Sequence, residues 1–82
     1  MNRSEVFEGI RRSLQRIILE KGEAEIDILE NTRILGSKLP IDSLDLATLV
    51  IELQTLTGKD PFVNGFIEFQ TAGELADLFC DV

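Results

Sequence analysis

Residues 39–56 read LPIDSLDLATLVIELQTL, and their apolar side chains recur at the spacing of an α-helix. Asp42 stands before the run as a helix N-cap, and Gly58 follows it as a residue that readily ends a helix. We therefore predict a helix from about Ser43 to Leu56. Only a narrow strip of it is polar, so we expect it both to pack against several neighbours and to expose an apolar edge.

The residues before this helix predict one long helix followed by one long loop. Apolar residues at helical spacing run from Arg3 to Glu20, Asn2 and Glu5 have the spacing of a capping box, and Gly22 suits the C-terminal end. Residues 23–41 contain Gly and Pro and form no long regular element. We expect an ordered loop there, held over the helices by five apolar side chains: Ile26, Ile28, Leu29, Ile34 and Leu39.

The residues after Gly58 predict two more helices. Asp60-Pro61 favours the start of a short helix over about 60–67, and Thr71 with Glu74 forms a capping box for a closing helix. The predicted fold is all-α: a small antiparallel bundle of three main helices plus one short helix, with a long ordered first loop. Eighty-two residues make a single domain, 1–82.

Charge narrows the range of partners. The net charge is −7, with five basic and three acidic residues in 1–22 but three basic and twelve acidic residues in 23–82. This balance disfavours nucleic acid and anionic membranes as partners and favours proteins with basic patches. No apolar run is long enough for a signal peptide or a membrane span, and the lone Cys80 suits a reducing compartment, so we expect a cytoplasmic protein without stable membrane insertion.

Several kinds of chemistry are absent from the sequence. Without His, the chain has neither a Ser-His-Asp triad nor a His metal site, and one Cys provides neither a disulfide nor a zinc site. It has no Gly-rich phosphate loop, nucleophile elbow or EF-hand pattern. We therefore expect neither a catalytic residue nor a metal site, and a carrier or binding protein rather than an enzyme.

Ser43 is the residue best placed for chemistry. It stands at the start of the central helix, where free N–H groups and a partial positive charge favour an attached phosphodiester. Composition alone leaves a second interpretation open, in which Ser43 merely caps the helix, because Ser and Asp are common at helix starts.

Residues 39–56 resemble the Asp-Ser-Leu signature and second helix of acyl carrier proteins. The similarity extends over the chain: an amphipathic first helix, a long apolar loop, the Ser-bearing helix, a short third helix and a closing helix with Thr-x-x-Glu-Leu-Ala. The resemblance implies that a phosphopantetheinyl transferase, using magnesium of its own, moves the 4′-phosphopantetheine arm of coenzyme A onto Ser43. The thiol of the arm then carries acyl groups as thioesters.

The resemblance also implies partners and recognition residues. The partners would be the transferase and acyl-transferring, condensing or acyl-activating enzymes with basic docking patches, acting on a monomeric carrier. Five residues match positions near the modified serine or on the partner-facing side of the second helix: Asp42, Leu44, Asp45, Ile51 and Glu52. From periodicity alone, Leu44 and Ile51 fit the core equally well.

The cargo is less defined by the sequence than the attachment site. Thr48, Gln54 and Thr55 stand where acidic residues are common in the family, which favours a specialised lipid or polyketide-type pathway over housekeeping fatty acid synthesis. An aminoacyl or peptidyl cargo is a second choice. A sheltered acyl chain would be lined, from periodicity, by five residues: Ile10, Leu14, Val50, Phe66 and Phe79.

An alternative from another class is an acidic helical interaction module that never carries a covalent group. It shares the size, acidity and apolar edge of a carrier. Ser43 discriminates between the two, since none of the other serines, Ser4, Ser13 and Ser37, has Asp before it and Leu after it.

Overall fold

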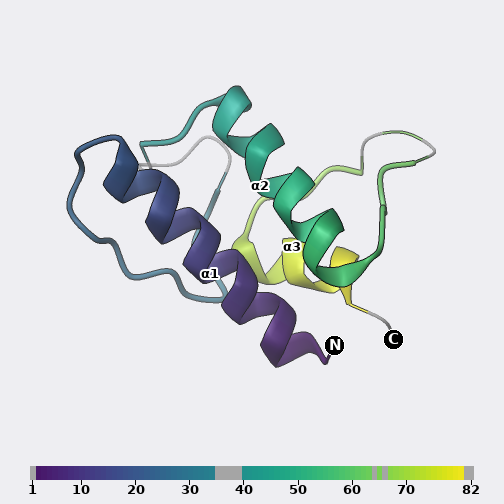
Figure 1. The fold of residues 1–82 in the computed structure, drawn as a ribbon. Helices are drawn as coiled ribbons and strands as arrows, with labels where there is room; N and C mark the ends of the chain where they lie inside the picture. Colours follow the sequence, from purple (N-terminus) through teal and green to yellow (C-terminus); the bar gives the residue numbers. More distant parts are fainter. Residues whose placement is uncertain (1, 35–39, 64, 66, 81–82) are drawn as a thin grey trace.

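The described part of the chain forms three α-helices joined by loops (Figure 1). The computed structural model describes residues 2–34, 40–63, 65 and 67–80. Its helices are α1 (Arg3–Glu20), α2 (Ser43–Thr57) and α3 (Ala72–Phe79). The described residues contain no strand, and their one β-bridge joins Arg33 to Thr71. The three main helices and the all-α class predicted from the sequence are confirmed.

Helix α1 has the bounds and caps that its sequence predicts. The Glu5 N–H donates to Asn2 Oδ1 at 2.9 Å, and the Asn2 N–H donates to Glu5 Oε1 at 3.1 Å, which completes the capping box. At the other end Gly22 takes a φ of 82°, a left-handed conformation that Gly adopts without strain. The inward face of α1 is fully apolar and consists of Val6, Ile10, Leu14, Ile17 and Ile18.

Helix α2 runs back along α1, so the two helices are antiparallel (Figure 1). It ends at Gly58, which has a φ of 73° and donates its N–H to Gln54 at 2.8 Å. Three contacts along the pair set the register. They join Lys21 to Asp45, Arg16 to Glu52, and Gly9 to the side chain of Leu56.

The first loop lies against the start of α3. Thr71 caps α3 by accepting from the Glu74 N–H at 3.1 Å. The Ala72 and Gly73 N–H groups, which the helix leaves unpaired, donate to the carbonyls of Thr32 and Glu30, each at 2.9 Å. The loop thus supplies the hydrogen bonds that α3 lacks.

The apolar residues expected to hold this loop over the helices differ in how far they are buried. Ile28 and Ile34 are buried and Ile26 is half-buried, as expected. Leu29 was expected to be covered, but it is exposed because it sits just before the turn at 30–31. Leu39 lies outside the described residues.

The predicted short helix over 60–67 is absent from the described residues of that segment. They form turns at 61–63, where the Val63 N–H donates to the Asp60 carbonyl at 3.3 Å and the Phe62 N–H to Asp60 Oδ1 at 3.1 Å. Gly65 has a φ of 126°, which no helix accommodates. The turns hold Phe62 against the rings of Phe69 and Phe79, at centroid distances of 6.2 and 6.0 Å.

One hydrophobic core joins the helices and the loop. Helix α1 supplies five of its buried residues and α3 supplies four, whereas α2 supplies only Leu49 and Leu53. Leu46 and Val50 are half-buried and pack against this core, whereas the other apolar residues of α2 are exposed: Leu44, Ala47, Ile51 and Leu56. Within the described residues, no helix is long and apolar enough to cross a membrane.

Candidate functional site

Ser43 is the first residue of α2 and is exposed. Its neighbours fill the capping role: the Asp45 N–H donates to Asp42 Oδ1 at 2.9 Å, and the Asp42 N–H donates to Asp45 Oδ2 at 3.0 Å. Within the described part of the chain, no hydrogen bond engages the Ser43 hydroxyl. The interpretation of Ser43 as a mere capping residue therefore has no support from the geometry.

Lys21 brings a positive charge to the start of α2. Its ammonium forms an ion pair with Asp45 and lies 3.9 Å from Asp42 Oδ2. The hydrogen bond from Lys21, helped by the Asp42 N–H, lowers the pKa of Asp45, and the same pair raises the pKa of Lys21. Both acids beside Ser43 are thus partly neutralised, which favours an anionic group attached there.

The two apolar recognition candidates lie outside the core. Leu44 is 77% exposed and Ile51 is 61% exposed. The sequence left open whether these positions are core or surface, and the structure places both on the surface. They lie seven residues apart on α2, close to one line along the helix, about a quarter of a turn around it from Ser43.

The acidic recognition candidates are arranged differently. Asp42 is exposed beside Ser43, but Asp45 and Glu52 are half-buried and pair with the α1 cations Lys21 and Arg16. These two acids hold α1 to α2. The sequence did not predict either pair, because the partners are far apart along the chain.

A hollow of about 360 Å³ opens beside Ser43. Its other lining residues in the described part of the chain are apolar and come from α2 and the turn that follows it: Leu46, Ala47, Val50, Ile51 and Phe62. The first three could have been found from Ser43 by helical spacing, since they stand three, four and seven residues after it. Phe62 could not, because the turn that places it is non-helical.

The acyl shelter expected from periodicity shares only Val50 with this hollow. Ile10, Leu14 and Phe79 have exposed fractions of 0–1% and belong to the close-packed core. Phe66 lies outside the described residues. The hollow beside Ser43 therefore lies between α2 and the turn at 61–63, outside the close-packed core.

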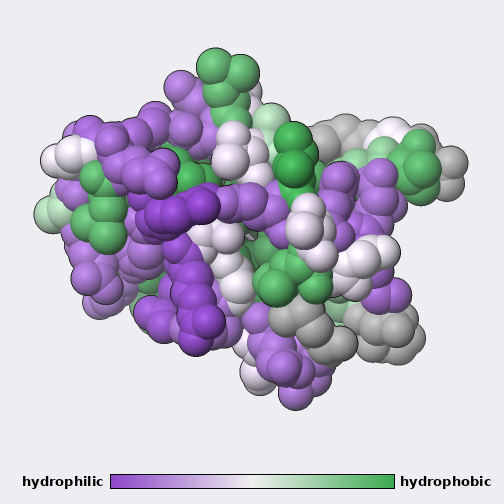
Figure 2. All heavy atoms as spheres, in the orientation of Figure 1, coloured by the Kyte–Doolittle hydropathy of each residue, from purple (hydrophilic) through white to green (hydrophobic). Residues whose placement is uncertain are grey.

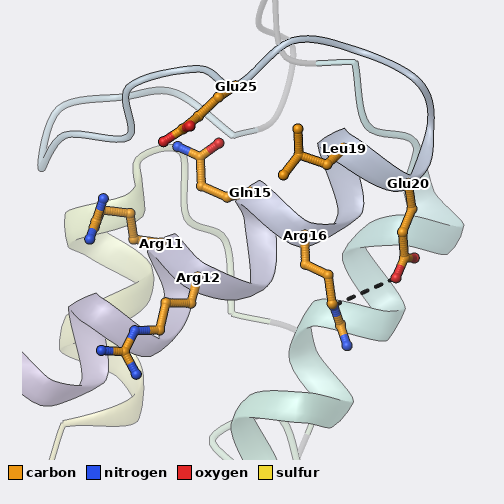
Figure 3. Close-up of a pocket in the computed structure, with 7 residues that line it drawn as sticks. All are labelled: Arg11, Arg12, Gln15, Arg16, Leu19, Glu20 and Glu25. Atoms are coloured by element: carbon orange, nitrogen blue, oxygen red, sulfur yellow. Dashed lines mark ion pairs between the residues drawn. The ribbon is translucent and has the colours of Figure 1, made fainter.

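A larger hollow, about 540 Å³, lies between α1 and the first loop, and Ser43 is not among its described lining residues (Figure 3). Its arginines already have partners. Arg11 pairs with Glu8 at 2.5 Å, and Arg16 lies 4.0 Å from Glu20, the dashed line in Figure 3. With Glu25 also in its wall, this hollow has mixed charge and no preference for an anion.

Other candidate chemistry is missing from the described residues. They contain no group of three or more His, Cys, Asp or Glu side chains that could hold a metal ion. Cys80 is a half-buried free thiol. Comparisons with protein-family models, with curated proteins and with solved structures found no match to this chain.

Proposed function

We propose that this chain is an acyl carrier protein that bears a phosphopantetheine arm on Ser43. The observation that carries the proposal is that this serine, within an Asp-Ser-Leu motif, is exposed and does not cap its helix. It is exposed at the first position of α2, and Asp42 and Asp45 cap the helix in its place. A hydroxyl without a structural task is available for modification.

The reaction requires little from the chain itself. In the transferase, the Ser43 oxygen attacks the phosphorus next to the pantetheine of coenzyme A, a phosphodiester forms, and the nucleotide half leaves. The start of α2 then holds the phosphodiester, because the free N–H groups of a helix N-terminus stabilise a negative charge by about 0.3–1 kcal/mol. The carrier presents the serine, and the enzymes that act on it perform the catalysis.

The hollow beside Ser43 suits the apolar part of an arm or its acyl cargo. Its volume of about 360 Å³ is near the lower end for small-molecule sites, and its described lining residues other than Ser43 are apolar. This lining favours an acyl group over an aminoacyl group, whose ammonium would lose its water there. We place the carrier in the cytoplasm, in a lipid or polyketide-type pathway, as a monomer.

The experiment is loading by a broad-specificity phosphopantetheinyl transferase. Co-expression should add the mass of one phosphopantetheine to the wild type, and Ser43→Ala should remove that addition. Ser4→Ala is the matched control, because Ser4 is also exposed in the first turn of a helix. It should load fully.

A second candidate function is a non-carrying interaction module. It is favoured by the exposed apolar side chains Leu44, Ile51 and Val63. An unmodified wild type, beside a known carrier converted in the same reaction, would support this candidate. Modification of Ser43→Ala at another serine would keep the carrier function and overturn the site.

A further inference from the structure

Both charged residues of α2 face α1. Asp45 and Glu52 are the only charged residues between Ser43 and Thr57. Each is half-buried and forms an ion pair with a cation of α1: Asp45 with Lys21, and Glu52 with Arg16. The negative charge of α2 is therefore used within the fold.

The outer surface of α2 is uncharged. We call it the α2 face; it consists of the seven exposed residues of the helix, Ser43, Leu44, Ala47, Thr48, Ile51, Thr55 and Leu56. The hydroxyls of its two threonines already donate hydrogen bonds within the helix. Thr48 donates to the Leu44 carbonyl at 3.1 Å and Thr55 to the Ile51 carbonyl at 3.2 Å. In Figure 2, hydrophobic and near-neutral atoms gather along α2, whereas hydrophilic atoms dominate over α1.

We propose that the enzyme that modifies Ser43 docks on the α2 face through a surface that is itself apolar and uncharged, with Ile51 as an anchor. This inference rests on the proposed function and specifies the partner of the same site. A cation brought to the α2 face would lose water and find no unpaired carboxylate on it. An apolar surface would instead cover Leu44 and Ile51 without such a cost.

The remaining acids have a different effect. Asp42 borders the α2 face, but it caps the helix and lies 3.9 Å from the Lys21 ammonium. Other exposed acids, such as Glu23 and Glu68, are outside α2. They give the chain a long-range field that speeds encounter with a basic enzyme, while the contact at α2 is apolar. The net charge of the sequence therefore does not describe the docking surface.

Two variants separate an apolar contact from a basic one, and each has a matched control. Thr48→Glu adds an acid to the α2 face, and Ala24→Glu adds the same charge on the exposed first loop. Ile51→Ala truncates a side chain that is 61% exposed, and Leu29→Ala truncates one that is 60% exposed on that loop. The measurement is kcat/KM for transfer of phosphopantetheine from coenzyme A, with circular dichroism to confirm the fold.

An apolar contact predicts that Thr48→Glu lowers kcat/KM, whereas a basic contact predicts that it raises kcat/KM. We expect Thr48→Glu and Ile51→Ala each to lower kcat/KM about tenfold or more, and both loop controls to stay within about twofold of the wild type. Faster loading of Thr48→Glu, or unchanged loading of both α2 variants, would overturn the apolar docking surface and leave the carrier function standing. A wild type that never loads would overturn the carrier function and this inference together.

Discussion

At the residue scale, Gly73 is a glycine at which an added Cβ would meet the backbone of another segment. A Cβ there would lie 2.8 Å from the Glu30 carbonyl oxygen, which the Gly73 N–H binds at 2.9 Å. We predict that Gly73→Ala lowers the free energy of unfolding by about 1–3 kcal/mol, because backbone must move on one side of the contact. Urea unfolding at pH 7 measures the change.

Gly9→Ala is the matched control, because it also adds one methyl group to a helix. Its Cβ would meet only the end of the Leu56 side chain, at 2.5 Å, and Leu56 is half exposed and free to turn away. The gain in helix propensity, about 1 kcal/mol, should offset that shift. Equal losses for the two variants would contradict the difference drawn between a backbone contact and a side-chain contact.

Single residues also show how far the sequence predicts the site. Ser43 could be placed at the start of a helix because capping is a local rule. Leu44 and Ile51 could not be assigned to core or surface, because periodicity defines the faces of a helix but not which of them its neighbours cover. Asp45 was read as a recognition residue, and its role in the capping box of α2 was missed because Asp at that position departs from the usual Glu or Gln.

At the scale of elements, local signals predicted α1, α2 and α3. Each helix begins after a capping residue, Asn2, Asp42 or Thr71, whose side chain accepts a hydrogen bond from the backbone N–H three residues later. The segment 60–67 was the exception. Its apolar spacing and the Asp60-Pro61 pair favoured a helix, but the φ of Gly65 and the packing of Phe62 against α3 give turns. Tertiary packing thus overrode a weak local preference.

Lys21 links two elements, the end of α1 and the start of α2. Because the pKa of Asp45 is lowered in the folded state, the pair adds stability at pH values above about 4, the ordinary pKa of Asp. That stability is lost as the pH falls through the lowered pKa. We predict that Lys21→Gln is less stable than the wild type at pH 7 and loses less stability below pH 4, as urea unfolding across that range would show.

Arg33→Gln is the matched control, because it also removes one positive charge. The guanidinium of Arg33 forms no ion pair among the described residues. This variant should keep the acid sensitivity of the wild type, because the Lys21–Asp45 pair remains. If Lys21→Gln and Arg33→Gln respond identically to acid, the net charge and not the pair determines the effect.

At the scale of the whole molecule, charge and apolar surface are separated. The cations of α1 neutralise the acids that face it, and the excess acids lie on the loops and α3, so the α2 face is left uncharged. The sequence predicted the net charge of −7 but not this division, which depends on which helices lie side by side. The same division makes association of the chain depend on pH.

Near pH 4.4 the net charge approaches zero and no longer keeps molecules apart. We predict that the folded wild type then self-associates through the α2 face and is monomeric at pH 7, as measured by sedimentation velocity. The double variant Leu44→Ser/Ile51→Ser should stay monomeric at both pH values. Leu29→Ser/Val63→Ser, which removes two exposed apolar side chains outside α2, should associate like the wild type. If both double variants associate equally at pH 4.4, with helical circular dichroism retained, the α2 face is not the adhesive surface.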